Sequence, residues 1–182
     1  MLEKIKKHAF WIGIACVSII RVLLVLNLPI FAIAPAAVDD RLMVNMAYSL
    51  LKGEWLGNYN QFTLSKGMMF PLFLAMTHRI GISYITSTSL LYVFSSILMI
   101  ICLKHIIRNK KILFCIFVAL VFNPAMFSVQ VIMRVYRNAL TPAQVLLILS
   151  CCMQIYFQIK HNSKALAWSI AGRNQFSIFL SY

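Results

Sequence analysis

The sequence predicts an all-α protein, a polytopic transmembrane helical bundle of about five spans with one long external loop that contains interfacial helices. Hydrophobic residues make up 62% of the 182 residues, and the mean hydropathy is +0.84. The apolar residues also occur in long blocks rather than in short amphipathic stripes. A soluble fold of this length could not bury so many apolar residues in one core, whereas about 20 of them form a membrane-spanning helix.

Residues 9–34 form the first apolar block and predict the first span. Residues 84–103, 112–131 and 143–159 predict three more spans, and residues 165–182 are a fifth, less apolar candidate. Asn123-Pro124 is expected to kink the third of these helices or to end it early. The basic N-terminus before an apolar run resembles a signal peptide. However, the run exceeds the usual ~7–15 residues and further spans follow, so an uncleaved first helix is expected.

The basic residues predict the orientation of the spans. Lysines and arginines cluster at three places, namely Lys4, Lys6 and Lys7, then Lys104, Arg108, Lys110 and Lys111, and finally Lys160 and Lys164. Positive charge stays on the cytoplasmic side. We therefore expect residues 1–8 in the cytoplasm and residues 35–83 outside. The expected location is the inner (plasma) membrane of a bacterium. The net charge of +13 does not indicate nucleic-acid binding, because no recognised motif accompanies it.

The external loop contains two short apolar segments, residues 40–52 and 68–80. Each is too short to span a bilayer, and each is typical of a helix that lies along the membrane surface. Between them, residues 53–60 combine turn residues with aromatic residues that favour the membrane interface.

Asp39 and Asp40 are the only aspartates among four acidic residues, and they directly follow the first span. One of them can be explained as a helix N-cap or an early acidic residue that interacts with the helix dipole. The other indicates a carboxylate at the membrane surface, acting as a general base or as a ligand of a divalent metal. No other cofactor is indicated. The five cysteines and four histidines show no metal-ligand spacing, so no metal cluster is predicted.

Several cations fall on the outer side in this topology, where the orientation rule disfavours them. They are Arg41, Lys52, Lys66, Arg79, Arg134 and Arg137. Anionic lipid headgroups are one explanation. Recognition of a phosphorylated lipid is the other, because the planar arginine fork binds phosphate oxygens in pairs. Arg134 and Arg137 share a helix face if their segment is helical, and Gly67 after Lys66 would allow a close ligand approach.

These motifs together resemble a known family. The chain has a first helix, then Asp39-Asp40, then a helix with Ala47-Tyr48-Ser49-Leu50-Leu51. Next come Gly53-Glu54-Trp55-Leu56-Gly57 and Lys66-Gly67-Met68-Met69-Phe70-Pro71-Leu72-Phe73-Leu74-Ala75. This order resembles the N-terminal part of GT-C-fold membrane glycosyltransferases, such as the protein O-mannosyltransferases and the bacterial aminoarabinose transferases of lipid A. The resemblance covers residues 9–158.

The resemblance implies transfer of a sugar from a polyprenyl-phosphate or polyprenyl-diphosphate donor to an extracytoplasmic acceptor in the cell envelope. It makes Asp39 or Asp40 the catalytic carboxylate, leaving open which, and makes Lys66, Arg134 and Arg137 candidates for binding the carrier phosphate. Members of this family are several hundred residues long. The chain is therefore expected to be a truncated fragment, which could lack activity.

Two other interpretations stay open. A transporter or flippase of lipid-linked glycans would also use outward cations and the intramembrane Arg21. Its external loops would be short, however, and its binding site would lie near mid-membrane. A non-catalytic membrane subunit would tolerate the loss of both aspartates. Beyond the lipid bilayer and the polyprenyl-phosphate sugar, no partner is indicated, and the oligomeric state is not predicted.

Overall fold

The computed structural model describes residues 2–30, 37–57, 67–128 and 131–179, with side chains from residue 8 to residue 160 except residue 37. This part of the chain is all-α and contains no strand. Its elements are α1 (Leu2–Val25), α2 (Ala37–Leu51), α4 (Met69–Ile80), α5 (Tyr84–Leu103), α6 (Lys110–Val121), the 3₁₀ helices η2 (Pro124–Phe127) and η3 (Arg137–Ala139), and α7 (Thr141–Phe179). Within these residues, four helical segments are long and apolar enough to cross a membrane. The predicted helical membrane bundle is confirmed.

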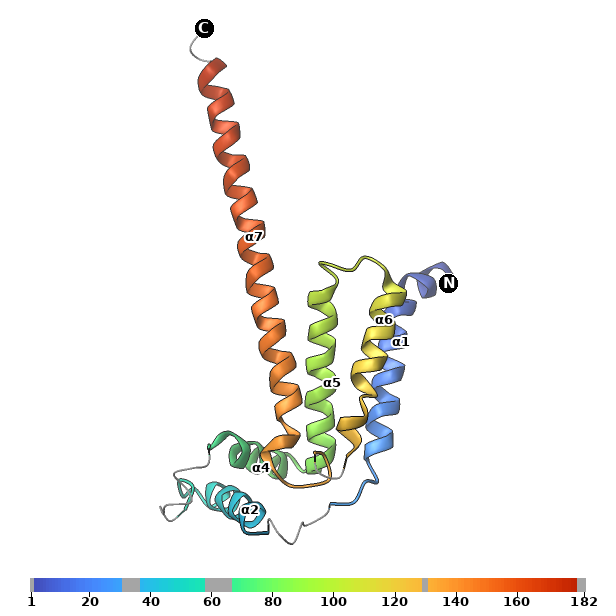
Figure 1. The fold of residues 1–182 in the computed structure, drawn as a ribbon, viewed down its shortest axis with the longest axis vertical. Helices are drawn as coiled ribbons and strands as arrows, with labels where there is room; N and C mark the ends of the chain where they lie inside the picture. Colours follow the sequence, from blue (N-terminus) through green and yellow to red (C-terminus); the bar gives the residue numbers. More distant parts are fainter. Residues whose placement is uncertain (1, 31–36, 58–66, 129–130, 180–182) are drawn as a thin grey trace.

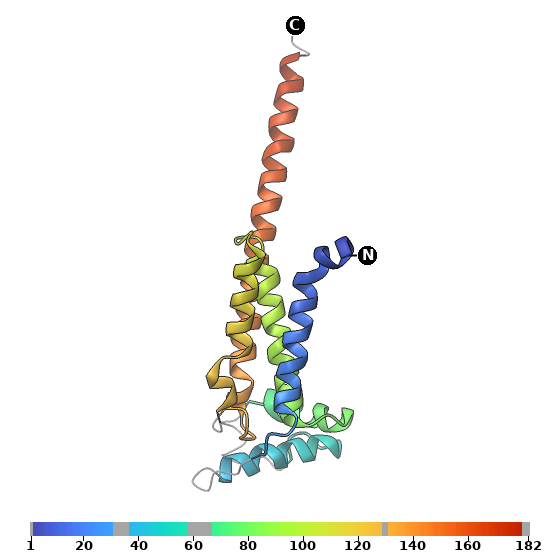
Figure 2. The same cartoon turned by 90° about the vertical axis from the view of Figure 1, so that its right-hand side faces the viewer.

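Helices α1, α5, α6 and α7, which form the four candidate spans, run side by side, and α2 and α4 lie across one end of them (Figures 1 and 2). The N-terminal end of α1 and the loop between α5 and α6 lie at the opposite end. The two short loop helices that the sequence predicts at 40–52 and 68–80 are therefore present as α2 and α4. We call the end that carries α2 and α4 the capped end, and the other the basic end.

Helix α5 lies at the centre of the bundle, in contact with α1, α4, α6 and α7. Half of its residues are buried, against 17–22% for the other three candidate spans. Its buried face is rich in small hydroxyl residues, which allow helices to approach closely in a membrane. The hydroxyls of Thr88, Ser95 and Ser96 donate to carbonyls one turn earlier, so they are satisfied within the helix.

Helices α1, α5 and α6 share an apolar core made of Ile14, Ile100, Leu113, Phe117 and Val121. Helix α6 ends after only 12 residues. Asn123 then caps η2, because its side-chain oxygen accepts a hydrogen bond from the Ala125 amide at 3.0 Å, and Pro124 occupies the first turn of η2. The predicted break at Asn123-Pro124 is confirmed.

A second core fastens α2 and α4 to the capped end of the bundle. Its buried members come from α1, α2, α4, α5 and the segment before α7, and they are Val25, Met43, Phe70, Tyr84, Ile85, Ile132, Ala139 and Leu140. Because segments that are far apart in the sequence all contribute to it, this core fixes the start of α2 against residues 131–140.

The structure differs from the prediction at two helix ends. Helix α1 ends at Val25, whereas the first span is predicted to reach residue 34, and residues 31–36 are outside the described part. Residues 165–179 continue α7, a single helix of 39 residues, instead of forming a separate fifth span. No proline follows Pro142, and the polar residues around Gly172 weaken a helix without ending it.

Candidate functional site

The two aspartates lie in the first turn of α2, at the capped end of the bundle. The sequence predicts a helix that begins at residue 40 with one aspartate as its N-cap. Instead α2 begins at Ala37, so both carboxylates lie inside the first turn. Acidic side chains at this position interact favourably with the free amides and the positive end of the helix dipole. The dipole therefore explains part of the stabilisation of the two carboxylates. It does not explain which side chains they contact.

Asp40 binds Arg134 through both of its oxygens. The Arg134 Nε donates to Oδ1 at 2.9 Å and to Oδ2 at 3.0 Å, and Nη2 donates to Oδ1 at 2.7 Å. The Arg134 and Asp40 side chains are only 15% and 13% exposed. The hydrogen bonds that Arg134 donates to Asp40 raise the pKa of Arg134. The structure thus brings together two predicted site residues that are 94 positions apart in the chain, and it shows that they neutralise each other.

Arg134 and Arg137 do not share an α-helical face. Residues 131–136 form turns and bends, and only Arg137–Ala139 is helical, as the 3₁₀ helix η3. The two guanidinium groups instead lie over one aromatic ring, with their Cζ atoms 4.5 Å and 5.6 Å from the centroid of Tyr136. Cations are attracted to such a ring face, so Tyr136 holds both arginines close together at the capped end.

Tyr84 holds the backbone of this segment. Its hydroxyl donates to the carbonyl oxygens of Arg134 at 3.0 Å and Tyr136 at 3.4 Å. The Tyr84 ring is buried and packs edge-on against Phe70 of α4, with the centroids 6.0 Å apart. Because Tyr84 is the first residue of α5, the segment that carries the arginines is tied directly to the central helix.

A small cavity lies at the capped end, between α2, α4 and α7. One of its lining residues, Arg137, shares the Tyr136 ring with Arg134 of the ion pair. Its volume is about 170 Å³, and its lining includes Met43, Gly67, Arg137, Thr141 and Gln144. Met43 is one helical turn beyond Asp40 on α2. Lys66, the third predicted phosphate ligand, lies outside the described residues. Its neighbour Gly67 lines the cavity, and no atom lies within 4 Å of where a Cβ would stand.

These residues can bind an anion and move a proton. Arg137, Thr141 and Gln144 supply donors around the cavity, and Asp40 and Arg134 supply a charge pair at the same end of the bundle. No family model, curated protein or solved structure matches this chain. Among the described residues, no three or more His, Cys, Asp or Glu side chains are grouped to hold a metal ion.

Arg21 lies near the capped end of α1 and is fully buried. Its Nη2 donates to the Met126 carbonyl at 2.9 Å, and its Cζ lies 3.7 Å from the centroid of the Phe127 ring. Its Nε and Nη1 have no hydrogen-bond partner among the described residues. The sequence indicates that the charge is inside the first span but names no partner. In the structure Arg21 binds the Met126 carbonyl in η2, after α6, where the last carbonyls of a helix have no partner within it.

Sequence reasoning missed four residues of the site. Tyr84 and Tyr136 fix and stack the arginines, and Thr141 and Gln144 line the cavity. The two tyrosines stand near helix ends, where membrane proteins commonly place this residue type for other reasons. Thr141 and Gln144 lie in the first turn of α7, before the apolar stretch 145–149, and this change in polarity is a signal that could have indicated them.

Proposed function

We propose that this chain is the donor-binding part of a membrane glycosyltransferase that uses a polyprenyl-phosphate-linked sugar. In this proposal the basic end faces the cytoplasm of a bacterium and the capped end faces the outer side of its inner membrane. The acceptor is an extracytoplasmic molecule of the cell envelope. The observation that carries the proposal is the cavity lined by Arg137 and Gly67 between α2, α4 and α7. Its Arg137 shares the Tyr136 ring with Arg134, the partner of Asp40.

The arginines are the groups that would bind the donor phosphate. A phosphate on a long apolar chain would reach the capped end from the bilayer, at the level of the helices that lie across the bundle (Figure 2). Arg137 lines the cavity, and Arg134 is held on the same tyrosine ring. Since a guanidinium binds phosphate through two parallel hydrogen bonds, a phosphate at this position would compete with Asp40 for Arg134.

The carboxylates would take the acceptor proton. Transfer forms a bond between an acceptor oxygen or nitrogen and the anomeric carbon, and it breaks the bond from that carbon to the phosphate oxygen. Polyprenyl phosphate leaves with the electron pair, and the acceptor proton passes to a general base. Both oxygens of Asp40 are engaged by Arg134, so Asp40 serves as the base only after Arg134 has turned to the donor. Asp39 is the other candidate for the base.

A binding experiment tests this function. The purified chain in lipid nanodiscs is titrated with a short polyprenyl phosphate and, separately, with the same polyprenol without phosphate. We expect binding only with the phosphate, and we expect Arg137→Gln to weaken it roughly tenfold, since a hydrogen bond to a charged group contributes about 1.5–3 kcal/mol. Arg79→Gln removes one exposed cation from α4 and serves as the matched control. Equal binding of the polyprenol would contradict the proposal.

The direction in which one substitution changes the affinity for polyprenyl phosphate tests whether the donor competes with Asp40. If phosphate must displace Asp40 from Arg134, the Asp40→Asn substitution removes the competitor. The variant protein then binds polyprenyl phosphate several-fold more tightly than the wild-type chain does. If Asp40 instead holds Arg134 in place for the phosphate, the same variant binds more weakly. In a transfer assay on membranes supplied with polyprenyl-linked sugars, substitution of the general base, Asp39→Asn or Asp40→Asn, is expected to abolish product formation.

The alternative of a transporter or flippase depends mainly on Arg21. That residue is enclosed between α1 and η2, and one of its donors is used on a backbone carbonyl. A substrate site on broken helices near mid-membrane would require this arginine to face an open cavity. The geometry at the capped end therefore favours a site at the membrane surface.

A further inference from the structure

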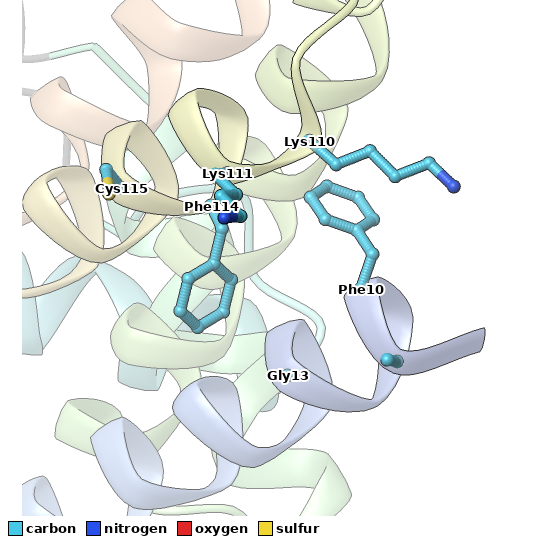
Figure 3. A pocket seen from close by; sticks show the side chains of 7 residues that line it. Phe10, Gly13, Lys110, Lys111, Phe114 and Cys115 are labelled. Carbon is cyan, nitrogen blue, oxygen red and sulfur yellow. The ribbon is translucent and has the colours of Figure 1, made fainter. Parts of the chain in front are cut away.

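A second hollow lies at the basic end of the bundle, between the N-terminal halves of α1 and α6 (Figure 3). Its volume is about 390 Å³, and it is lined by Ala9, Phe10, Gly13, Lys110, Lys111, Phe114 and Cys115. The proposed glycosyltransferase site at the capped end uses none of these residues.

The hollow has apolar walls and a basic rim. Gly13 lets the two helices approach closely, because a Cβ there would lie only 2.9 Å from Cε2 of Phe114. The Lys110 side chain runs beside the Phe10 ring, and Phe114 points down toward α1. Ala9 and Cys115 are exposed, and the α1 and α6 spans are mostly unburied, at 17% and 22%. The hollow therefore opens on the surface that faces lipid.

The rim of the hollow carries several positive charges. The carboxylates in the part of the chain that the structure describes do not balance them. Lys110 and Lys111 stand in the first turn of α6, which has no acidic residue, although the dipole there already favours anions. Lys104 lies nearby, over the rings of Trp11 at 3.8 Å and Phe10 at 5.1 Å. Burial, and next the charge of Lys110, lower the pKa of Lys104.

Three of the four acidic residues of the chain lie at the opposite end of the bundle. Asp39, Asp40 and Glu54 belong to α2 and the turn after it, at the capped end. Glu3 lies in the first turn of α1, and its side chain is outside the described part. From residue 55 to residue 182 the sequence contains no acidic residue. An anion from outside the chain would therefore be attracted to this rim.

We propose that the hollow binds an anionic phospholipid of the bilayer. Its phosphate would lie between Lys110 and Lys111 at the N-terminus of α6, and one acyl chain would run along Phe10, Phe114 and Cys115. Basic pockets between membrane helices on the cytoplasmic side bind such headgroups. The charge selects an anionic lipid, and the apolar walls select a ligand that carries a hydrocarbon chain.

Quenching of the Trp11 fluorescence measures lipid binding. In a Trp55→Phe, Trp168→Phe background Trp11 is the only tryptophan. We reconstitute this protein with phosphatidylcholine and increasing amounts of phosphatidylglycerol whose acyl chains are brominated, because bromine quenches nearby indole fluorescence. The reference is brominated phosphatidylcholine. We expect phosphatidylglycerol to bind at least roughly threefold more tightly than phosphatidylcholine, since each lysine near the surface contributes about a fivefold preference.

Two variants and one control distinguish a site from general attraction. Lys110→Gln with Lys111→Gln should abolish the preference, whereas Lys160→Gln with Lys164→Gln removes the same charge from α7 and should leave it unchanged. Cys115→Phe fills the hollow but keeps both lysines, and it should also reduce the preference. Equal quenching by the two lipids in the parent would overturn the proposal. So would an equal loss in both lysine pairs, or a Cys115→Phe protein with the full preference.

Discussion

At the scale of single residues, the Asp40–Arg134 pair connects the start of α2 to the segment before α7. Its geometry is bidentate and it is largely shielded from solvent, so it should stabilise the fold more than an exposed ion pair would. A double-mutant cycle with Asp40→Asn and Arg134→Gln should give a coupling energy of about 1–3 kcal/mol. The measurement is unfolding of each variant in mixed micelles.

The neighbouring aspartate is the control for this cycle. Asp39 contributes less than Asp40 to the electrostatic environment of Arg134, so Asp39→Asn should couple to Arg134→Gln more weakly than Asp40→Asn does. Coupling of the same size for both aspartates would mean that the pair acts through net charge at the helix end rather than through its hydrogen bonds.

The sequence singled out the charged residues of this site better than it described their arrangement. Asp39 and Asp40 were predicted as site residues because acidic residues are scarce in this chain. Arg134 and Arg137 were predicted because the expected topology places these cations on the outer side. It could not show that Asp40 and Arg134 pair, because the two residues are 94 positions apart and a core of apolar side chains decides that contact. The arginines would share a helix face only if their segment were helical, and this condition is not met. Residues 131–136 form turns and bends, and the Tyr84 hydroxyl binds the carbonyls of Arg134 and Tyr136.

At the scale of elements, the packing of α1 on α6 depends on the missing side chain at Gly13. A Cβ would stand 2.9 Å from the Phe114 ring, so Gly13→Leu should separate the helices and lower the free energy of unfolding by about 1–3 kcal/mol. Gly13→Ala should cost less, because the contact is with the end of a side chain that can move. Unfolding in mixed micelles measures both.

Two further variants test whether the Phe114 contact is the cause. Combining Gly13→Leu with Phe114→Leu should recover part of the lost stability, since the smaller side chain makes room. Gly67→Ala, at a position with no atom within 4 Å of the added Cβ, should leave the helix packing unchanged. If Phe114→Leu recovers nothing, the cost at Gly13 must come from another contact.

The elements themselves were largely predictable, because their signals are local. Apolar length predicted the spans, shortness predicted α2 and α4 as separate helices, and Asn123-Pro124 predicted the end of α6. The sequence was less informative where a helix ends without proline. Residues 165–179 contain polar positions but nothing that stops a helix, so they extend α7 to about 58 Å at 1.5 Å per residue.

At the scale of the whole molecule, the two ends of the bundle differ in charge and in architecture. The basic end has the N-terminus of α1, a short loop that contains Lys104 and Arg108, and Lys110 at the start of α6. The capped end has both aspartates, two helices that lie across the bundle and the ion pair that neutralises Arg134. Short basic loops near helix ends determine orientation more than long loops do. The proposed orientation therefore follows from the loop between α5 and α6.

Cysteine labelling tests this orientation. In a chain whose five cysteines are replaced by serine, Glu54→Cys places a thiol after α2 and Ile106→Cys places one in the loop between α5 and α6; both positions are exposed. A maleimide that cannot cross the inner membrane should label position 54 in cells with a permeable outer layer, and should label position 106 only after the inner membrane is opened. Neither substitution removes a positive charge, so the signal that orients the chain is kept. The reverse pattern would place the aspartates in the cytoplasm, where the proposed transfer to an envelope acceptor could not occur.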